Sequence, residues 1–307
     1  MNIDGIINVN KEKGYTSFDV VACLRGIIGM RKIGHTGTLD PDATGVLPVC
    51  LGKATKVVDF LTDKQKTYKA IFKTGFVTDT QDVSGTVIEK FNGSVTLDEV
   101  IATLTGFVGE YSQIPPMYSA LKHNGKKLYK LAREGIVVER EARARVIHSI
   151  SQIEQLSNDT FSFEVTCSKG TYIRTLIYDV GNSLNVGATM TELERTLVEP
   201  FRLENAYTLK EIEEIVKNNK INDIIMKIDE LFETYKALVV SAEYEKALYN
   251  GNKLPIQLLI DKGYKVIENE RYRVYDSNKR FIGLYKIVDR VDEEKIIKIL
   301  KVDKMFY

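Results

Sequence analysis

The chain has few of the residues that build metal centres or disulfide frameworks. Its 307 residues include three cysteines and three histidines, and no Cys-x-x-Cys pair occurs. Cys23, Cys50 and Cys167 lie far apart in apolar or strand-like surroundings, which is typical of reduced, buried thiols in a cytoplasmic protein. The sequence therefore argues against a disulfide scaffold and against a zinc site, and we expect no bound metal.

Long apolar runs are also missing. No stretch approaches the roughly 20 apolar residues that a membrane helix needs, and the first residues, MNIDG, lack the basic region and apolar core of a signal peptide. We therefore expect a cytoplasmic protein with no membrane partner. The composition, 44% hydrophobic and 28% charged, is that of an ordinary globular protein with one large domain or two unequal ones.

The chain lacks a large net charge of either sign, since its formal net charge is only +1. The charges are nevertheless unevenly distributed. Residues 120–148 hold eight Lys/Arg against three Asp/Glu, with Tyr118, His123 and Tyr129 within or beside this run. Such a surplus suits a surface that follows phosphates, although a solvated basic face without a partner would have the same composition. Residues 203–235 are acidic, with an amphipathic helical pattern, and we place them away from any nucleic acid.

One short segment combines a carboxylate with a restricted backbone. Residues 34–45 read GHTGTLDPDATG, in which Pro41 pushes Asp40 away from the helical region. The apolar run VLPVCL follows and is expected to anchor the segment on a buried strand or helix. The pattern indicates either a carboxylate held on a stiff loop, as covalent or acid–base catalysis requires, or a plain Asp-Pro turn.

Apolar periodicity predicts a mixture of helices and strands. Ser17 and Thr96 are candidate helix caps, and Gly29 is expected to end the first helix. The helices are predicted at residues 18–28, 97–104, 126–134 and 171–185. The strands are predicted at residues 6–10, 67–76, 86–91, 145–156 and 160–168. This order indicates an α+β fold around a large antiparallel or mixed sheet.

The C-terminal part of the chain has a different character. The pattern breaks near residues 219–236, and residues 272–286 then read as strand–turn–strand. Residues 236–307 carry fifteen Lys/Arg against eleven Asp/Glu. About seventy residues with several short strands suit a small β-barrel. We therefore predict two domains, at residues 1–235 and 236–307.

Several motifs, in a fixed order, resemble those of the TruB family, the bacterial pseudouridine synthases that act on the T-arm of tRNA. Residues 34–45 resemble the catalytic signature of this family. Further motifs are similar at residues 7–17, 66–70, 78–85, 115–122 and 167–176. The resemblance covers about residues 5–200 and implies the pseudouridine synthase fold. The C-terminal region resembles, by position, size and strand pattern, the PUA RNA-binding domain.

The resemblance implies conversion of uridine to pseudouridine at position 55 in the T-loop of tRNA. The reaction breaks the N–C glycosidic bond and joins the ribose to C5 of the base, and it needs no metal, redox or nucleotide cofactor. We expect a monomeric isomerase whose partner is the T-arm stem-loop. Two alternatives stay open: a non-catalytic RNA-folding module, and a synthase of the same fold with another RNA target.

The same resemblance assigns three catalytic positions. Asp40 is the carboxylate that attacks C1′ or removes a sugar proton, and the sequence does not choose between these routes. Tyr68 stacks on the flipped base and can serve in proton transfer. Arg174 pairs with Asp40, holding the carboxylate in one orientation and ionised.

Further positions are predicted to bind the substrate. The target uridine lies inside a folded arm, so it must be extruded, and His35 is expected to enter the space that it leaves or to stack on its neighbours. Tyr172 and Leu193 are expected to line the base pocket, although Leu193 also suits plain core. Phosphate contacts are expected from four lysines: Lys11, Lys13, Lys64 and Lys66.

Four other acidic residues have weaker claims. Asp42 and Asp59 compete with Asp40 as the catalyst, but neither aligns with the catalytic aspartate of the family, and Asp42 is expected to point away or to bond locally. Asp79 and Asp82 lie in a segment that lacks the ligand count of a calcium loop, so we interpret it as a support for the site.

Overall fold

Two sheets of different size organise the chain. The computed structural model describes residues 3–265, 267, 269–292 and 295–307. Its larger sheet has ten strands in the order β14-β1-β3-β12-β4-β11-β10-β7, with β2 paired to β3 and β13 paired to β12. In chain order these strands are β1 (Gly5–Lys11), β2 (Ile33–His35), β3 (Thr44–Leu51), β4 (Lys66–Thr74), β7 (Gly109–Gln113), β10 (Arg143–Ser157), β11 (Thr160–Cys167), β12 (Ala188–Val198), β13 (Phe201–Arg202) and β14 (Ile225–Met226).

The pairing of β12 brings distant parts of the chain together. β12 runs parallel to β3, with Glu194 opposite Thr44 and Arg195 opposite Gly45. On its other side β12 runs antiparallel to β4, where Arg195 lies opposite Tyr68. The beginning of β3, which directly follows the Asp40 segment, therefore meets the beginning of β4 across a single strand.

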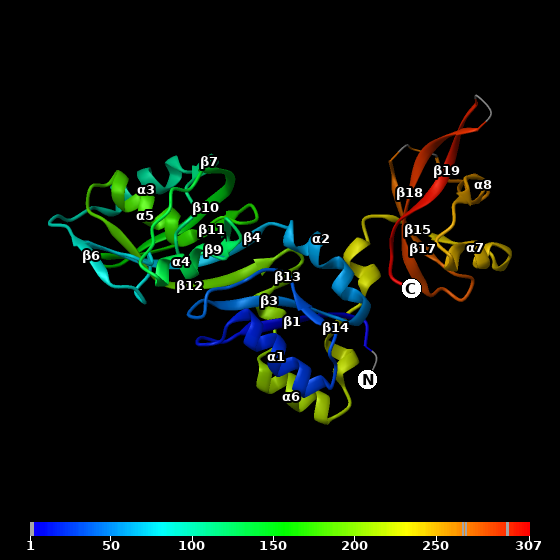
Figure 1. Cartoon of the computed structure of the whole chain (residues 1–307), viewed down its shortest axis with the longest axis horizontal. Coiled ribbons are helices and arrows are strands. Elements are labelled where there is room, and N and C mark those ends of the chain that lie inside the picture. Colours follow the sequence, from blue (N-terminus) through cyan, green and yellow to red (C-terminus); the bar gives the residue numbers. More distant parts are fainter. Residues whose placement is uncertain (1–2, 266, 268, 293–294) are drawn as a thin grey trace.

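Alternation along β1 explains how this end of the sheet is covered on both sides. Ile7 and Val9 face a core that includes two helices, whereas Ile6 faces the opposite side. The two helices lie side by side beneath the strands (Figure 1). They are α1 (Ser17–Ile28) and α6 (Leu209–Lys217).

Local signals set the ends of these helices. α1 begins with a capping box between Thr16 and Asp19 and ends at Gly29, whose φ of 71° is left-handed. α6 begins with a second capping box, between Thr208 and Glu211. The same motif starts the helix α3 (Leu97–Gly106), where Thr96 is the cap.

A second core lies under the other half of the large sheet. Phe72 of β4 packs against two rings of β11. The centroid of its ring lies 5.5 Å from that of Phe161 and 5.9 Å from that of Phe163. The helices α3 (Leu97–Gly106) and α5 (Ile173–Ser183) contribute Leu104 and Leu176 to this core. The core therefore fixes α5, whose first turn carries Arg174.

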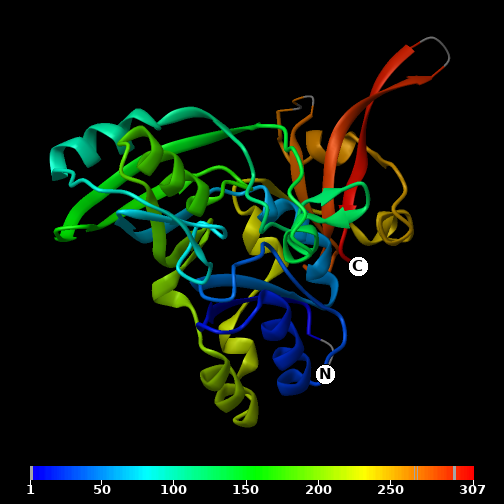
Figure 2. The same ribbon diagram turned by 60° about the vertical axis from the view of Figure 1, so that its left-hand side comes forward.

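The smaller sheet has five strands and occupies the C-terminal part of the chain, which forms a separate lobe in Figure 1. Its order is β15-β17-β18-β19-β16, and the long β18–β19 pair reaches away from the rest of the molecule (Figure 2). The strands are β15 (Lys236–Val239), β16 (Leu254–Pro255), β17 (Arg271–Tyr275), β18 (Phe281–Asp292) and β19 (Lys295–Met305). The curled sheet agrees with the small β domain that the sequence predicts.

The two sheets share a hydrophobic core. Leu284 and Phe306 of the smaller sheet region are buried together with Val46 of β3 and Phe232. The Phe306 ring lies 5.5 Å from Phe281 and 6.2 Å from Phe232, measured between centroids. The C-terminal lobe is therefore joined to the main body by buried apolar contacts as well as by the chain.

Shorter elements complete the fold. Two small hairpins pair β5 (Phe76–Thr78) with β6 (Val87–Lys90) and β8 (Lys122–His123) with β9 (Lys126–Lys127). The short helices are α2 (Val58–Thr62), α4 (Leu128–Arg133), α7 (Glu245–Tyr249) and α8 (Gln257–Ile260). Among the residues that the structure describes, no helix is long and apolar enough to span a membrane.

The predicted α+β architecture is confirmed, with two local corrections. Thr16, not Ser17, caps the first helix. The Ser17 hydroxyl instead accepts a hydrogen bond from the Leu39 N–H. The predicted helix at residues 126–134 begins later, at Leu128, because residues 122–127 form the β8–β9 hairpin.

Candidate active site

The loop that carries Asp40 is held from several sides. The Leu39 N–H donates to the Ser17 hydroxyl at 2.9 Å. The Pro41 carbonyl accepts from the Gly14 N–H at 2.9 Å and from Lys11 Nζ at 2.9 Å. Leu39 and Ala43 on either side of Asp40 are buried in the core next to β4 and β12. The carboxylate therefore stands on a loop with little freedom to move.

Arg174 connects this loop to two other segments. Its Nε lies 3.0 Å from Asp40 Oδ2 and its Nη1 lies 3.4 Å from Asp82 Oδ2. Nη1 also donates to the Thr80 carbonyl at 2.8 Å, and Nη2 donates to the Tyr118 carbonyl at 3.0 Å. One guanidinium therefore joins the Asp40 loop, the segment 78–85 and the segment that begins at residue 115.

The carboxyl group of Asp40 has a perturbed affinity for protons. Burial by the surrounding protein raises its pKa, the neighbouring charge of Asp82 raises it further, and Arg174 and Lys11 act in the opposite direction. Solvent still reaches the group, since 41% of the side chain is exposed. An accessible carboxylate with a raised pKa has the character of a catalytic base or nucleophile.

Tyr68 lies within reach of the same charges. It is a half-buried residue of β4 that packs against the large core. Burial raises the pKa of its phenol, opposed by the nearby Arg195 guanidinium. The ring is therefore neutral at physiological pH and offers an apolar face on which a pyrimidine can stack.

The predicted base-pocket residues come from two elements. Tyr172 precedes α5, and the buried Gln113 side chain grips its backbone by accepting from the Tyr172 N–H at 2.8 Å and donating to the Tyr172 carbonyl at 2.9 Å. Leu193 lies on β12 and is buried in the core beside Leu39 and Ala70. Leu193 therefore supports the Asp40 loop from below.

His35 ends β2 and approaches the loop from the other side. Its Nδ1 accepts from the Gly37 N–H at 3.3 Å, an arrangement that leaves the proton of a neutral ring on Nε2. Burial lowers the pKa of His35, and Arg195 lowers it further. The imidazole is therefore uncharged at physiological pH.

The four predicted lysines separate into two kinds. Lys11 is fully buried, and its Nζ donates to the carbonyls of Glu12, Tyr15 and Pro41. Lys66 is also buried, and its Nζ donates to the carbonyls of Leu61, Thr62 and Lys64. Burial lowers the pKa of each to about 8.

These contacts correct the prediction for Lys11 and Lys66. Their ammonium groups satisfy backbone carbonyls and are withdrawn from the surface where a phosphate would bind, so both lysines brace loops. Lys13 is exposed, and Lys64 is half-buried with an ion pair to Glu199 at 3.6 Å. These two remain candidates for phosphate contacts.

The acidic alternatives are not part of the cluster. Asp42 is exposed, in agreement with the expectation that it points away. Asp59 lies in α2, and its carboxylate faces Lys304 of β19 at 3.9 Å. Asp79 accepts from the Thr86 N–H and from the Tyr118 hydroxyl, which orders the supporting segment. Within the described residues there is no group of three or more His, Cys, Asp and Glu that could hold a metal ion.

A basic segment adjoins the site. The segment from Tyr118 to Glu134 folds on its own small core of Met117, Leu128 and Leu131. It exposes five basic side chains: Lys122, Lys126, Lys127, Lys130 and Arg133. Its first residue is the Tyr118 whose carbonyl binds Arg174. Five of the eight basic residues that the sequence places in residues 120–148 therefore belong to a segment whose first residue contacts Arg174.

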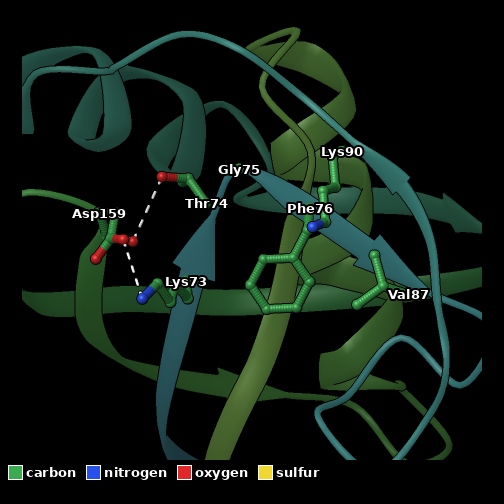
Figure 3. A pocket seen from close by; sticks show the side chains of 7 residues that line it. All are labelled: Lys73, Thr74, Gly75, Phe76, Val87, Lys90 and Asp159. Atoms are coloured by element: carbon green, nitrogen blue, oxygen red, sulfur yellow. Dashed lines mark hydrogen bonds and ion pairs between the residues drawn. The ribbon is translucent and has the colours of Figure 1, made fainter.

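A surface hollow of about 350 Å³ lies elsewhere, at the far end of β4. Lys73, Lys90 and Phe76 line it, and Lys73 pairs there with Asp159 at 3.0 Å (Figure 3). None of the predicted site residues contributes to it.

The sequence matches two family models. They are the TruB family pseudouridylate synthase N-terminal domain, over residues 25–173, and the tRNA pseudouridylate synthase B C-terminal domain, over residues 174–233. The tRNA pseudouridine synthase B of Clostridium perfringens (strain SM101 / Type A) is 47% identical over 286 residues, which cover 92% of this chain and 95% of that protein. The chain belongs to the TruB family of pseudouridylate synthases. It is also 48% identical, over 301 residues, to the tRNA pseudouridine synthase B of Lachnoclostridium phytofermentans. This alignment covers 95% of this chain and 97% of that protein.

Solved structures share the fold of this chain. A chain in the "Structure of H/ACA RNP bound to a substrate RNA containing 2'-deoxyuridine" aligns over 99% of this chain and 85% of its own length, with a TM-score of 0.70 and 25% identity. A chain in the "Crystal Structure of a Cbf5-Nop10-Gar1 Complex" has a TM-score of 0.71 and 27% identity over the same shares.

Two residues of the site were not found from the sequence: Gln113, which binds the backbone of Tyr172, and Arg195, the buried cation opposite Tyr68. The sequence assigned Asp82 to a supporting segment but did not identify it as the second partner of Arg174. A signal existed for Arg195. It lies two residues after Leu193 on a strand, so the alternation that buries Leu193 also turns Arg195 inward.

Proposed function

We propose that this enzyme isomerises uridine to pseudouridine in tRNA, at position 55 of the T-loop, with Asp40 as the catalytic carboxylate. The observation that carries the proposal is the contact between Asp40 and Arg174. An exposed carboxylate is oriented by a buried guanidinium on a loop that Ser17 and Lys11 hold in place.

The proposed chemistry begins at the sugar. Asp40 acts either by attacking C1′, with the uracil leaving through N1, or by removing a sugar proton so that the same bond breaks. The detached base then turns and its C5 bonds to C1′; in the first route this step breaks the bond between C1′ and the carboxylate, and in the second the proton returns to the sugar. The proton on C5 is lost and N1 gains one, so the product is an isomer of the substrate and no oxidant or reductant is consumed.

The surrounding residues supply orientation. Arg174 holds the carboxylate through one charge-assisted hydrogen bond and keeps it available in its ionised form. Tyr68 stacks on the extruded base and can move a proton at the ring, and Tyr172 borders the same space. His35 enters the position that the uridine leaves or stacks on neighbouring bases.

RNA docking is assigned to two regions. The basic segment from Tyr118 to Glu134 follows phosphates next to the site, with Lys13 and Lys64 as further contacts. Residues 236–307 form a PUA-like RNA-binding domain, and residues 1–235 form the catalytic domain; the beginning of β15 at Lys236 supports this boundary. We also propose that the enzyme is active as a monomer.

The test is pseudouridine mapping on tRNA incubated with the purified protein, without added metal or nucleotide. We expect pseudouridine at position 55 and activity on an isolated T-arm stem-loop. A product at another position, or in rRNA or mRNA and not in tRNA, would favour the same-fold synthase with another target. Tight binding with no pseudouridine in any of these RNAs would favour the non-catalytic folding module. Light scattering of the active fraction tests the monomer.

A further inference from the structure

Arg195 is the largest side chain that the fold buries completely, with 1% of its surface exposed. It lies on β12 between Gly45 of β3 and Tyr68 of β4. A buried guanidinium normally has a carboxylate partner. Among the residues that the structure describes, no acidic side chain forms an ion pair with Arg195, so a role in salt bridging does not explain its position.

The contacts of Arg195 lie at both ends of the Asp40 loop. Nε donates to the Val46 carbonyl at 2.7 Å, and Nη2 donates to the Gly37 carbonyl at 3.2 Å. Gly37 precedes Asp40 by three residues, and Val46 follows it by six. One planar group therefore closes the base of the loop, while the carboxylate stands at its other end.

The backbone of Arg195 is just as close to this loop. Gly45 has a φ of +99°, and a side chain there would collide with the Arg195 carbonyl. Glycine is therefore required where β3 meets β12. This close approach fixes the distance between β3, which follows the Asp40 loop, and β12, which pairs on its other side with β4 and places Arg195 opposite Tyr68.

The neighbourhood of Arg195 is positive. Its charge lowers the pKa values of His35, Lys11 and Lys66, in each case as a contribution secondary to burial. Gly37, whose carbonyl Arg195 binds, donates its N–H to His35 Nδ1. Arg195 therefore influences His35 both through its charge and through the backbone that positions the imidazole.

We propose that Arg195 is a positioning residue for catalysis: its guanidinium holds both ends of the Asp40 loop against β12, whose other neighbour β4 carries Tyr68, and thereby fixes the carboxylate relative to the ring that stacks on the uridine. The inference rests on the proposed function, because it concerns the geometry of that reaction. Arg195 itself is behind the site and does not need to touch the RNA.

Two substitutions test the proposal. Arg195→Lys keeps the charge and cannot bind both carbonyls with the geometry of a guanidinium, whereas Arg195→Met removes the charge as well. For each we expect kcat on a T-arm stem-loop to fall about 100-fold, because small displacements of reacting groups have effects of this size. KM is expected to stay within about threefold, because phosphate contacts elsewhere supply most of the binding.

A measurement without turnover separates this inference from the proposed function. The chain has only His35, His123 and His148, so the titration of His35 can be followed by NMR. Arg195→Met should raise the pKa of His35, because a neighbouring positive charge is removed, and Arg195→Lys should leave it close to that of the parent. This result is expected even if the parent protein proves inactive on tRNA, which would refute the proposed function alone.

The matched control is Thr189→Val. Thr189 is buried on the same strand, and its hydroxyl donates to the Phe76 carbonyl at 2.9 Å, far from Asp40. It should lower the melting temperature without changing kcat. If the Arg195 variants behave like this control, with lower stability and kcat within about twofold of an active parent, or if Arg195→Met leaves the His35 titration unchanged, the proposal is overturned. If Arg195→Met does not fold, the kcat and KM of Arg195→Lys decide.

Discussion

The side chain of Arg174 is almost fully buried, with 5% exposed, whereas its partner Asp40 is 41% exposed, and the Arg174 Nε lies 3.0 Å from Asp40 Oδ2. The cation is thus the fixed member of the pair and the carboxylate is the accessible one. Arg174 has further contacts to Asp82, Thr80 and Tyr118, so loss of Asp40 leaves it with other partners.

Asp40→Asn should abolish turnover and leave tRNA affinity within about tenfold of the parent, or ~1.4 kcal/mol. The carboxylate performs chemistry, while phosphate contacts supply most of the binding energy. Because burial raises the pKa of Asp40, its ionised form opposes folding at neutral pH, and the amide should not lower the melting temperature. Single-turnover assays, filter binding and thermal melts measure these effects. Pseudouridine formation at near-parental rate would contradict the assignment.

The raised pKa of Asp40 also predicts the pH dependence of activity. The reaction needs the ionised carboxylate, so kcat should fall as the pH decreases through this pKa, at a higher pH than for an ordinary aspartate of about 3.9. The charge of Asp82 is one cause of the increase. In Asp82→Asn the acid limb of the profile should therefore move to lower pH, whatever the effect on the maximum rate. An acid limb that stays in place, or moves to higher pH, would contradict the electrostatic assignment.

The basic segment should determine the salt dependence of binding. Replacing Lys122, Lys126 and Lys127 together by glutamine should weaken tRNA binding. The slope of log K against log salt concentration should decrease in magnitude by about 2, because each lost phosphate contact contributes about 0.7–0.9 to it. A matched triple variant removes three exposed lysines in and just after α6, Lys210, Lys217 and Lys220. That variant should leave the slope nearly unchanged; equal effects of the two sets would show that the contacts are not localised.

The core shared by the two sheets predicts that the C-terminal strands stabilise the whole chain. Phe306→Ala removes a buried ring that packs against Phe281 and Phe232, and should lower the free energy of unfolding by about 3–5 kcal/mol. The neighbouring Tyr307 is exposed, and its ring contacts Tyr249, Lys53 and Arg280 at the surface, so Tyr307→Ala should have a smaller effect, of about 1–2 kcal/mol. Chemical denaturation measures both. A small effect of Phe306→Ala would indicate that the two sheets unfold independently.

Much of the fold could be predicted because its signals are local. The helix from Leu97 depends on a cap and an acidic residue three positions later, and the end of the first helix depends on Gly29. The strand pair around residues 157–160 depends on alternation and on a polar turn. Such features lie within a few residues of one another, so no tertiary information is needed.

The parts that could not be predicted depend on distant pairing. Lysines are usually exposed, and nothing in the sequence around Lys11 or Lys66 shows that loop carbonyls will enclose their ammonium groups. The parallel pairing of β3 with β12 joins segments about 150 residues apart. The two hydrogen bonds between the Gln113 side chain and the Tyr172 backbone depend in the same way on where β7 and α5 meet.

The buried cluster of Val46, Phe232, Leu284 and Phe306 has a consequence for the length of RNA that the protein can accept. Val46 lies on β3, the strand that follows the Asp40 loop, so the same apolar contacts that fix this strand also fix the C-terminal sheet. An RNA that binds to both lobes would therefore contact two surfaces at a fixed distance from each other. The fixed distance would then select the length of RNA between the two bound regions. Adding or removing one base pair there would move the target nucleotide away from the Asp40 carboxylate, although the contacts at both bound regions would stay the same.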